Sequence, residues 1–381
     1  MKIAFIGAKT LPYPGGIEIF TEEVGWRLVE RGHEVMVDGR QHYARDGSSA
    51  YRGIRLVHLP SLGTKLLDNF SSSCLATMHL LYNKVDIVHL HTVGLSVLSL
   101  WPRIRGTKTI VQVHGLDWER EKWGQVAKFL IKQSDYTTRH FPDGIAVVSK
   151  ALEARYKGLC NRPVRYAPPG VDMPERASPD KLWGLGVAPM EYILFLGRPV
   201  PEKRCHDLLQ AYREVQTTKR LVIVGDAPHT DQYTAFLRRL ADGRTVFTGF
   251  VDDGLLAELI SNAYLCVFTS EVEGMSRFLL QALSYGRCVL ASDIEPNVEA
   301  LGECGFTFRV GDREDLRSRL EYLLVHPEIV AAQDDVARHR VKTTYSWENA
   351  VASLEQFYIE LVDGKGSKGS KAVRVNQFEE A

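Results

Sequence analysis

Short apolar runs alternate with amphipathic segments along most of the chain. Runs such as Lys2–Ile6, Thr109–Val113 and Tyr192–Leu196 have the length and composition of strands buried on both faces of a sheet. The segments between such runs carry apolar residues three and four positions apart, as in the helix expected to begin near Ile17. Strands that alternate with helices form parallel sheets, so the pattern predicts a doubly wound α/β protein.

One stretch rich in proline and glycine interrupts this alternation and predicts a connection between two domains. A further helix after the second domain is expected to cross back to the first. The last residues contain Gly-Lys-Gly-Ser-Lys-Gly-Ser, a composition typical of disorder. The predicted parts are a first domain at 1–168, a linker at 169–190, a second domain at 191–343, the returning helix at 344–362 and a disordered tail at 363–381.

The segment 270–293 holds the most informative turn. An apolar strand at Leu265–Phe268 runs into a turn with Glu271 and Glu273, and a helix opens after Gly274-Met275-Ser276. The exposed N–H groups and the positive end of a helix bind anions without a metal. The two carboxylates suit sugar hydroxyls instead. An ordinary βαβ unit with Ser276 as the helix N-cap explains the same pattern.

Three other positions carry chemistry at predicted strand ends. Gly15-Gly16 precedes a helix and lets a ligand approach the backbone, although a permissive turn is the alternative and no GxGxxG fingerprint is present. Arg198 and Lys203 can converge on a diphosphate, unless they are solvated surface charges. His114 can donate to a sugar hydroxyl or a phosphate, unless the backbone satisfies it.

Two weaker patterns leave alternatives open. His89 and His91 face the same side of a strand, but no carboxylate or cysteine nearby completes a metal site, so polar groups at a strand end explain them better. The segment 118–133 mixes tryptophans and other apolar residues with lysines and arginine. Such a basic amphipathic helix can lie on the anionic inner face of a membrane, or it can be a surface helix with snorkelling lysines.

Composition narrows the class of protein. The 381 residues are long enough for two domains, and 47 basic side chains balance 47 acidic ones, so bulk attraction to nucleic acid is not expected. The six cysteines form no CxxC pair, which indicates reduced, core-filling cysteines. The sequence contains no run of roughly 18 apolar residues, nor a signal-peptide pattern at its start. We therefore expect a cytoplasmic protein.

Taken in order, these motifs resemble the retaining glycosyltransferases of family 4, which have the GT-B fold. The resemblance covers roughly residues 1 to 362. It rests on Gly15-Gly16-Ile17-Glu18, His114-Gly115-Leu116-Asp117, Gly197-Arg198 with Lys203, and Glu273-Gly274-Met275-Ser276 followed by Leu279-Leu280-Gln281-Ala282. The phrase from His114 to Trp123 is especially similar to bacterial exopolysaccharide and rhamnan-type sugar transferases.

The resemblance implies two Rossmann-like domains facing each other across a cleft. It also implies transfer of a sugar from a nucleotide-sugar donor to a hydroxyl of a saccharide or lipid-linked acceptor, with retained anomeric configuration. No cofactor and no metal are expected, since the chain has no DxD sequence. The leaving-group oxygen is thought to take the acceptor's proton, so no separate general base is named. Bacterial surface or exopolysaccharide synthesis is the expected setting.

The resemblance assigns these roles to single residues. Arg198 and Lys203 hold the diphosphate, while Glu273 and His114 hold the donor sugar. The second acid of the family's Glu–x7–Glu motif, which holds the ribose, is Gln281 here. A neutral side chain makes weaker bonds, so this departure puts donor affinity in doubt. The remaining donor-binding residues are Gly15, Gly16, Gly197, Gly274, Met275, Ser276 and Phe250.

Two rival functions remain open. A sugar-nucleotide epimerase of the same fold would convert the donor without an acceptor. A catalytically weak partner subunit would bind the nucleotide and turn over nothing, and Gln281 keeps this rival open.

Overall fold

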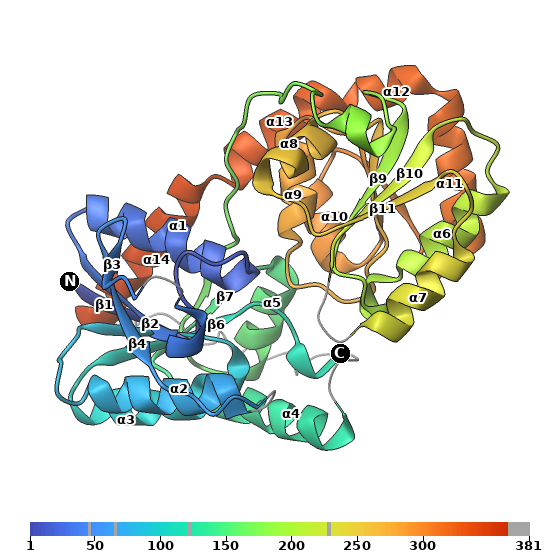
Figure 1. The fold of residues 1–381 in the computed structure, drawn as a ribbon. Coiled ribbons are helices and arrows are strands. Elements are labelled where there is room, and N and C mark those ends of the chain that lie inside the picture. Colours follow the sequence, from blue (N-terminus) through green and yellow to red (C-terminus); the bar gives the residue numbers. More distant parts are fainter. Residues whose placement is uncertain (45–46, 65–66, 120–123, 227–229, 365–381) are drawn as a thin grey trace, which may run out of the picture.

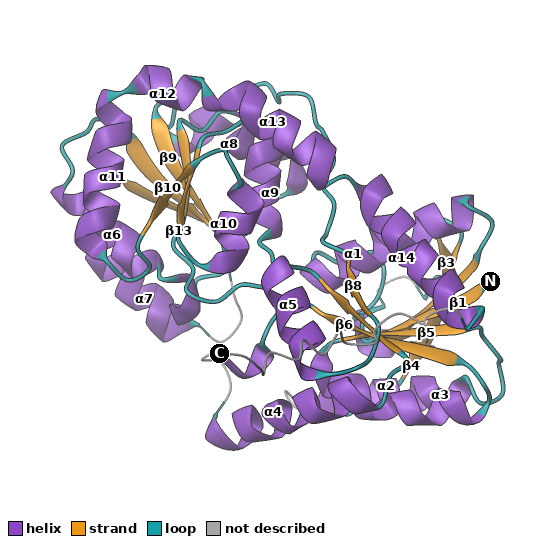
Figure 2. Ribbon diagram, turned by 180° about the vertical axis from the view of Figure 1, so that it is seen from behind, coloured by secondary structure: helices purple, strands orange, loops and turns teal. Residues whose placement is uncertain are grey.

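The computed structural model describes residues 1–44, 47–64, 67–119, 124–226 and 230–364. The chain forms two α/β domains that lie next to each other (Figure 1). Each domain has a central sheet with helices on both faces (Figure 2). The predicted pair of doubly wound, Rossmann-like domains is therefore confirmed.

The first domain is built on an eight-stranded sheet in the order β3-β4-β2-β1-β5-β6-β7-β8. Every neighbouring pair is parallel except the edge pair of β3 and β4. The strands are β1 Lys2–Ile6, β2 Glu34–Arg40, β3 Ala50–Tyr51, β4 Ile54–Leu59, β5 Ile87–His91, β6 Lys108–Val113, β7 Gly144–Val147 and β8 Val164–Tyr166.

Two groups of helices cover this sheet because successive side chains of a strand point to opposite faces. Ile3 and Phe5 of β1 pack on α1 and α14, whereas Ala4 and Ile6 share a core with α2, α5 and the 3₁₀ segment Val93–Ser99. The helices of this domain are α1 Gly16–Glu30, α2 Leu67–His79, α3 Leu100–Ile104, α4 Gln125–His140 and α5 Lys150–Leu159.

The second domain has a six-stranded parallel sheet in the order β11-β10-β9-β12-β13-β14. The strands are β9 Tyr192–Leu196, β10 Arg220–Val224, β11 Thr245–Gly249, β12 Leu265–Phe268, β13 Val289–Ser292 and β14 Phe306–Phe308. The helices are α6 Cys205–Glu214, α7 Asp231–Leu240, α8 Asp253–Ser261, α9 Arg277–Ser284, α10 Glu295–Leu301, α11 Arg313–Val325, α12 Pro327–Ala331 and α13 Gln333–Thr344.

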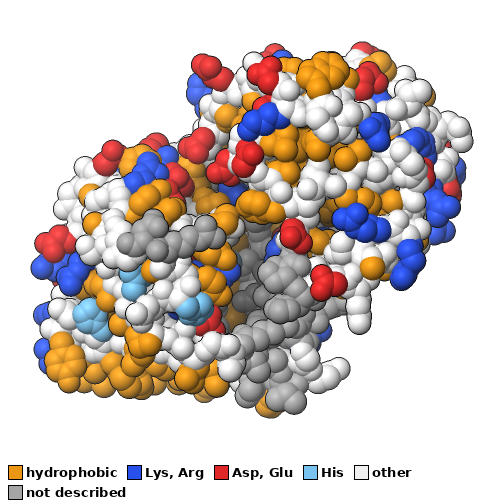
Figure 3. Space-filling model, in the orientation of Figure 1, with side chains coloured by type: hydrophobic (Ala, Val, Ile, Leu, Met, Phe, Trp, Pro, Cys, Tyr) orange, Lys and Arg blue, Asp and Glu red, His pale blue; other side chains and the backbone are white. Residues whose placement is uncertain are grey.

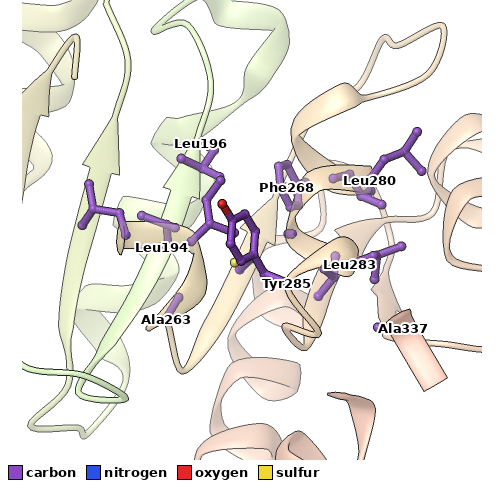
Figure 4. Packing of buried hydrophobic residues seen from close by; sticks show 14 of the residues in the cluster. Leu194, Leu196, Ala263, Phe268, Leu280, Leu283, Tyr285 and Ala337 are labelled. Atoms are coloured by element: carbon purple, nitrogen blue, oxygen red, sulfur yellow. The ribbon is translucent and has the colours of Figure 1, made fainter. Parts of the chain in front are cut away.

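Helix α9 owes its position to one apolar face. Leu280 and Leu283 belong to the same buried cluster as Leu194 and Phe268 of the sheet (Figure 4). The opposite face of the sheet packs on α6, α7 and α11. Because α9 is fixed to the strands on which it packs, the turn in front of it, where the expected site lies, has a rigid support.

The chain crosses between the domains at two neighbouring places. The first crossing follows β8, and the second precedes α14 Trp347–Val362, which packs on β1 and α1 of the first domain. A Cβ on Gly170 would lie 2.4 Å from the backbone nitrogen of Trp347, so the two crossings touch. Within the expected linker 169–190, Leu182 and Val187 are buried in the core of the second domain.

The helix expected at 118–133 differs in the structure. Trp118 lies in a short 3₁₀ turn, Asp117–Glu119, and packs against the core of the first domain. Helix α4 begins only at Gln125, after the N-cap Gly124, and runs on to His140. The expectation holds for residues 125–133, which belong to α4, and is wrong for Trp118, because Gly124 caps a new helix. Residues 120–123 lie outside the described residues.

The remaining expectations concern the cysteines, the tail and membrane-spanning segments. All six cysteines are free, and four of them are buried. The tail from 365 onward lies outside the described residues. Within the described part of the chain, no helix is both long and apolar enough to cross a membrane.

Candidate functional site

The turn between β12 and α9 begins the site. Ser276 is the N-cap of α9, and its Oγ accepts a hydrogen bond from the N–H of Leu279 at 3.4 Å. The N-cap interpretation of Ser276 is therefore confirmed. Met275 is partly buried and packs against core clusters of both domains. The turn is thus a point of contact between the domains.

Gly274 brings the turn against the backbone of the first domain. A Cβ at this position would lie 2.0 Å from the carbonyl oxygen of His114 and 2.6 Å from its carbonyl carbon. No side chain fits there, because backbone atoms cannot move aside as the end of a flexible side chain can. The glycine therefore places the carboxyl end of β12 opposite the carboxyl end of β6. Ligands of open α/β sheets bind outside such strand ends.

Glu273 forms an ion pair with Lys203, whose ammonium donates to Glu273 Oε1. The two side chains are only 12% and 17% exposed, so the pair is largely shielded from water. Ser270 Oγ also donates to Glu273 Oε1, at 2.9 Å. Thr269 Oγ1 donates to the carbonyl oxygen of Lys203 at 2.6 Å, which ties the two loops together. The structure therefore brings together two residues that the sequence placed 70 positions apart.

Gly197 and Arg198 directly follow β9, at the start of the loop that leads to Lys203. The side chain of Arg198 is exposed. A Cβ on Gly225 would lie 2.0 Å from the carbonyl oxygen of Gly197, so the turns after β9 and β10 run in backbone contact. The 3₁₀ turn Pro201–Lys203 follows Arg198 and ends at Lys203. One cation thus precedes this short turn above the sheet, and the other is its last residue.

His114 is oriented by a second histidine. His114 Nε2 lies 3.1 Å from Nδ1 of His91, and Phe20 packs edge-on at 5.4 Å between ring centroids. Burial holds the pKa of His91 well below its usual value, so this ring is neutral. Nε2 of His91 lies 2.9 Å from Oγ1 of Thr21, which donates its own proton to the carbonyl oxygen of Ile17.

These contacts fix the tautomer of His91 and make His114 its donor. Thr21 has one proton, already donated, so its oxygen accepts from Nε2–H of His91. The other nitrogen of the neutral His91, Nδ1, is then an acceptor, and His114 must donate to it through Nε2–H. The role of His114 toward a sugar hydroxyl or a phosphate stays a prediction.

The loop around Gly15 and Gly16 carries a carboxylate. Glu18 is buried, its Oε1 accepts from the N–H of Lys9 at 2.9 Å, and its Oε2 would lie 2.0 Å from a Cβ on Gly15. A Cβ on Gly16 has no neighbour within 4 Å. An anion at the start of α1 would therefore approach from the Gly16 side, because Glu18 repels it at Gly15.

Gln281 and Phe250 are two further residues that were predicted to bind the nucleotide-sugar donor. Gln281 is on α9, and its Oε1 is buried without a hydrogen-bond donor among the described residues. Phe250 follows β11 and is 71% exposed.

Sequence reasoning missed the residues that hold the turn in shape. Arg204 has a left-handed backbone, with φ 48°, and donates to Glu271 at 2.8 Å and to Asp207 at 2.6 Å. The N–H of Glu271 donates to the carbonyl oxygen of the buried Glu202 at 3.0 Å. The sequence shows a Lys-Arg pair in front of a helix. Only the fold shows that Lys203 pairs with Glu273 and Arg204 with Glu271.

Two family models match the chain in order. Residues 14–174 match the model described as Glycosyltransferase Family 4, and residues 191–326 match the one described as Glycosyl transferases group 1. Together with the two facing Rossmann-like domains, these matches define a glycosyltransferase of the GT-B class. Each model covers less than half of the chain, and together the two matches support a glycosyltransferase of the family 4 type.

Relatives and solved structures agree with this class. N-acetyl-alpha-D-glucosaminyl L-malate synthase of Bacillus anthracis is 24% identical, over 95% of this chain and 99% of its own. O-antigen chain mannosyltransferase B of Escherichia coli is 27% identical, over 44% of this chain and 45% of its own.

Two solved structures share the fold. Sucrose-phosphate synthase from Thermosynechococcus elongatus has a TM-score of 0.81 at 18% identity, over 96% of this chain and all of its own. Anabaena HepE in complex with UDP and glucose has a TM-score of 0.77 at 17% identity, over 94% of this chain and all of its own.

Proposed function

We propose that the protein transfers a sugar from a nucleotide-sugar donor to a hydroxyl of a saccharide or lipid-linked saccharide, with retained configuration and without a metal. The observation that carries the proposal is the Lys203–Glu273 pair, set against His114 by the contact at Gly274. This arrangement places a cation for a leaving diphosphate beside an acceptor for sugar hydroxyls. Both lie where the carboxyl ends of the two sheets meet.

In this proposal the cations stabilise the departing nucleoside diphosphate. The bond between the anomeric carbon and the diphosphate oxygen breaks, and negative charge grows on the phosphates. Arg198 binds as a fork and Lys203 as a point charge. The ammonium of Lys203 has three protons, so it can donate to a phosphate while it keeps its bond to Glu273. Preorganised donors of this kind are among the largest contributions to catalysis.

The donor sugar is held from two sides. Glu273, whose Oε1 is held by Lys203 and Ser270, accepts hydrogen bonds from sugar hydroxyls. His114 binds another hydroxyl of the sugar. The acceptor oxygen bonds to the anomeric carbon on the same face, and its proton passes to the leaving phosphate oxygen. No additional general base takes part.

The setting of the reaction follows from the sequence resemblance. The phrase beginning at His114 is similar to transferases of bacterial exopolysaccharides, and a relative acts, by its name, on an O-antigen chain. We therefore place the acceptor in the synthesis of bacterial surface or exported polysaccharide. The nucleotide-sugar donor is cytoplasmic in such a pathway, and we assign the protein to the same side of the membrane.

A donor panel tests the proposal against its rivals. UDP-, GDP-, dTDP- and ADP-sugars are screened by thermal shift, and those that raise the Tm are assayed for nucleoside diphosphate release with and without oligosaccharide acceptors. We expect one base to be preferred and release to increase at least about tenfold with an acceptor. Conversion of the donor sugar without an acceptor would establish the epimerase. Binding without any turnover across the panel would establish the catalytically weak partner.

A further inference from the structure

The outer face of helix α2 is apolar, whereas its inner face is polar. The residues turned outward include Leu67 at 47%, Leu75 at 38% and Met78 at 44% exposure. The residues buried against the sheet are Ser72, Ser73, Ala76 and Thr77. An amphipathic helix of a globular domain has the reverse arrangement. The fold of this chain alone gives no reason for leucine and methionine on the outside.

The apolar surface continues onto the neighbouring elements. The 3₁₀ segment Val93–Ser99 contacts both α2 and α4, and α3 contacts α2. These three helices lie along the same side of the first domain in both ribbon views (Figures 1 and 2), and apolar side chains line that edge (Figure 3). We call this surface the apolar layer; its exposed side chains are Leu67, Phe70, Leu75, Met78, Tyr82, Val97, Leu100, Ile104, Phe129 and Tyr136.

Basic side chains outnumber acidic ones along the apolar layer. Three of them are exposed: Lys84, which follows α2, Arg105, which follows α3, and Lys132 of α4. The acidic side chains of residues 67–108 and 124–140 each have a partner within the protein. Asp68 pairs with Arg40, Asp86 accepts from the N–H of Lys2 at 2.7 Å, and Asp135 accepts from Tyr156 at 2.7 Å.

We propose that the apolar layer is a docking surface for an anionic lipid bilayer, on which the first domain rests without crossing it. Exposed apolar side chains next to a surplus of basic side chains match the boundary between acyl chains and acidic headgroups. The surface is wider than the segment 118–133 suggested by the sequence, of which Phe129 and Lys132 are part. Trp118 packs against the core, and α2 supplies the larger share of the apolar side chains. The proposal stands independently of the sugar transferred.

Vesicle sedimentation tests the docking surface. The full chain is mixed with vesicles of phosphatidylcholine alone or with about 30% phosphatidylglycerol, a fraction of acidic lipid chosen to give a negative surface potential. We expect binding to the acidic vesicles that falls at least about tenfold in the double variant Leu75→Gln/Met78→Gln, because both side chains lose their contact with lipid. The matched control is Val325→Gln/Val336→Gln, which removes exposed apolar side chains of the second domain, at 70% and 45% exposure.

A second double variant tests the contribution of the basic side chains. Lys132→Gln/Arg105→Gln should weaken binding to the acidic vesicles about tenfold and leave binding to neutral vesicles unchanged. Unchanged Tm values show that each variant is folded, since all six substituted side chains are exposed.

Two results would overturn the proposal. In the first, the wild-type protein stays in the supernatant with acidic vesicles, or the control loses as much binding as Leu75→Gln/Met78→Gln. In the second, light scattering shows a wild-type dimer that this double variant converts to a monomer while neither protein binds vesicles. The apolar layer would then be an interface between two copies of the chain.

Discussion

The two carboxylates of the β12–α9 turn bind different cations. Glu273 pairs with Lys203, and Glu271 accepts from Arg204, which also donates to Asp207. A change at Glu271 therefore alters the shape of the loop after β9, whereas a change at Glu273 alters the proposed contact with the sugar. The turn pattern suggested sugar hydroxyls for both carboxylates, and the family motif named Glu273 alone. The partner of Glu271 depends on the left-handed backbone of Arg204.

Gln281 is the residue at which this chain departs from the family pattern. Its buried Oε1 has no donor among the described residues, as expected of an acceptor kept for a ligand hydroxyl. Gln281→Glu should tighten nucleoside diphosphate binding about tenfold in calorimetry, because a charge-assisted bond replaces a neutral one. Unchanged or weaker binding would count against the contact with the ribose.

Asp38 predicts a pH dependence of stability. It is buried on β2 with no described donor to either oxygen, and burial raises its pKa from 3.8 to about 7. Between these two values the folded state binds more protons than the unfolded state, so stability falls as pH rises through this window. Asparagine at this position has a neutral amide of the same shape, so it does not lose stability in this way.

The free energy of unfolding of Asp38→Asn, relative to that of the wild-type protein, should therefore increase as pH rises. The difference in unfolding free energy should widen by up to about 4 kcal/mol between pH 4 and pH 8, measured by urea denaturation. The exposed Asp180→Asn serves as a control and should show no such widening. A constant difference for Asp38→Asn across the range would mean that the carboxyl group has a donor in solution.

At the scale of elements, the β12–α9 turn depends on Gly274. Its side-chain position is taken by the backbone of His114, so Gly274→Ala must separate the two strand ends. We expect donor turnover to fall at least about 100-fold, since misplacement by about 1 Å has an effect of this size. Gly243→Ala is the control, because a Cβ there meets no atom within 4 Å. Similar turnover in both variants would show that the contact is not needed for activity.

Periodicity predicted the buried strands well because each is a short apolar run with helices on either side. It failed where the start of a helix or the orientation of its apolar face depends on the elements packed beside it. The start of α4 was placed too early across Gly124, and the outward apolar face of α2 was not foreseen. A pattern records which positions of a helix are apolar, but not which of its faces meets the sheet.

At the scale of the whole molecule, the two domains touch at more than the site. Glu299 of α10 accepts from Tyr166 at 2.7 Å and from the N–H of Lys150, the first residue of α5, at 2.6 Å. Tyr345 donates to the carbonyl oxygen of Glu299 at 3.0 Å, next to the second crossing. These bonds hold the domains beside the pair of crossings, and so fix the distance between the β12–α9 turn and His114.

The sequence predicted both domains and the residue types of the site, because each motif follows a recognisable strand. It could not predict how they meet. The contact of Gly274 with His114, the bond from His114 to the neutral His91 and the position of Glu18 beside Gly15 all join distant segments. Such contacts depend on the packing of one domain on the other, which no local pattern records.

The most direct test of the account is donor turnover in the presence of EDTA. Nucleoside diphosphate release is measured for the wild-type protein, for Arg198→Ala and for Arg213→Ala, an exposed arginine of α6 in the same domain. We predict that EDTA leaves the wild-type rate unchanged, that Arg198→Ala lowers it at least about 100-fold, and that Arg213→Ala stays within twofold. Loss of the wild-type rate in EDTA, or an Arg198→Ala rate within twofold of wild type, would contradict the claim that protein cations hold the leaving diphosphate.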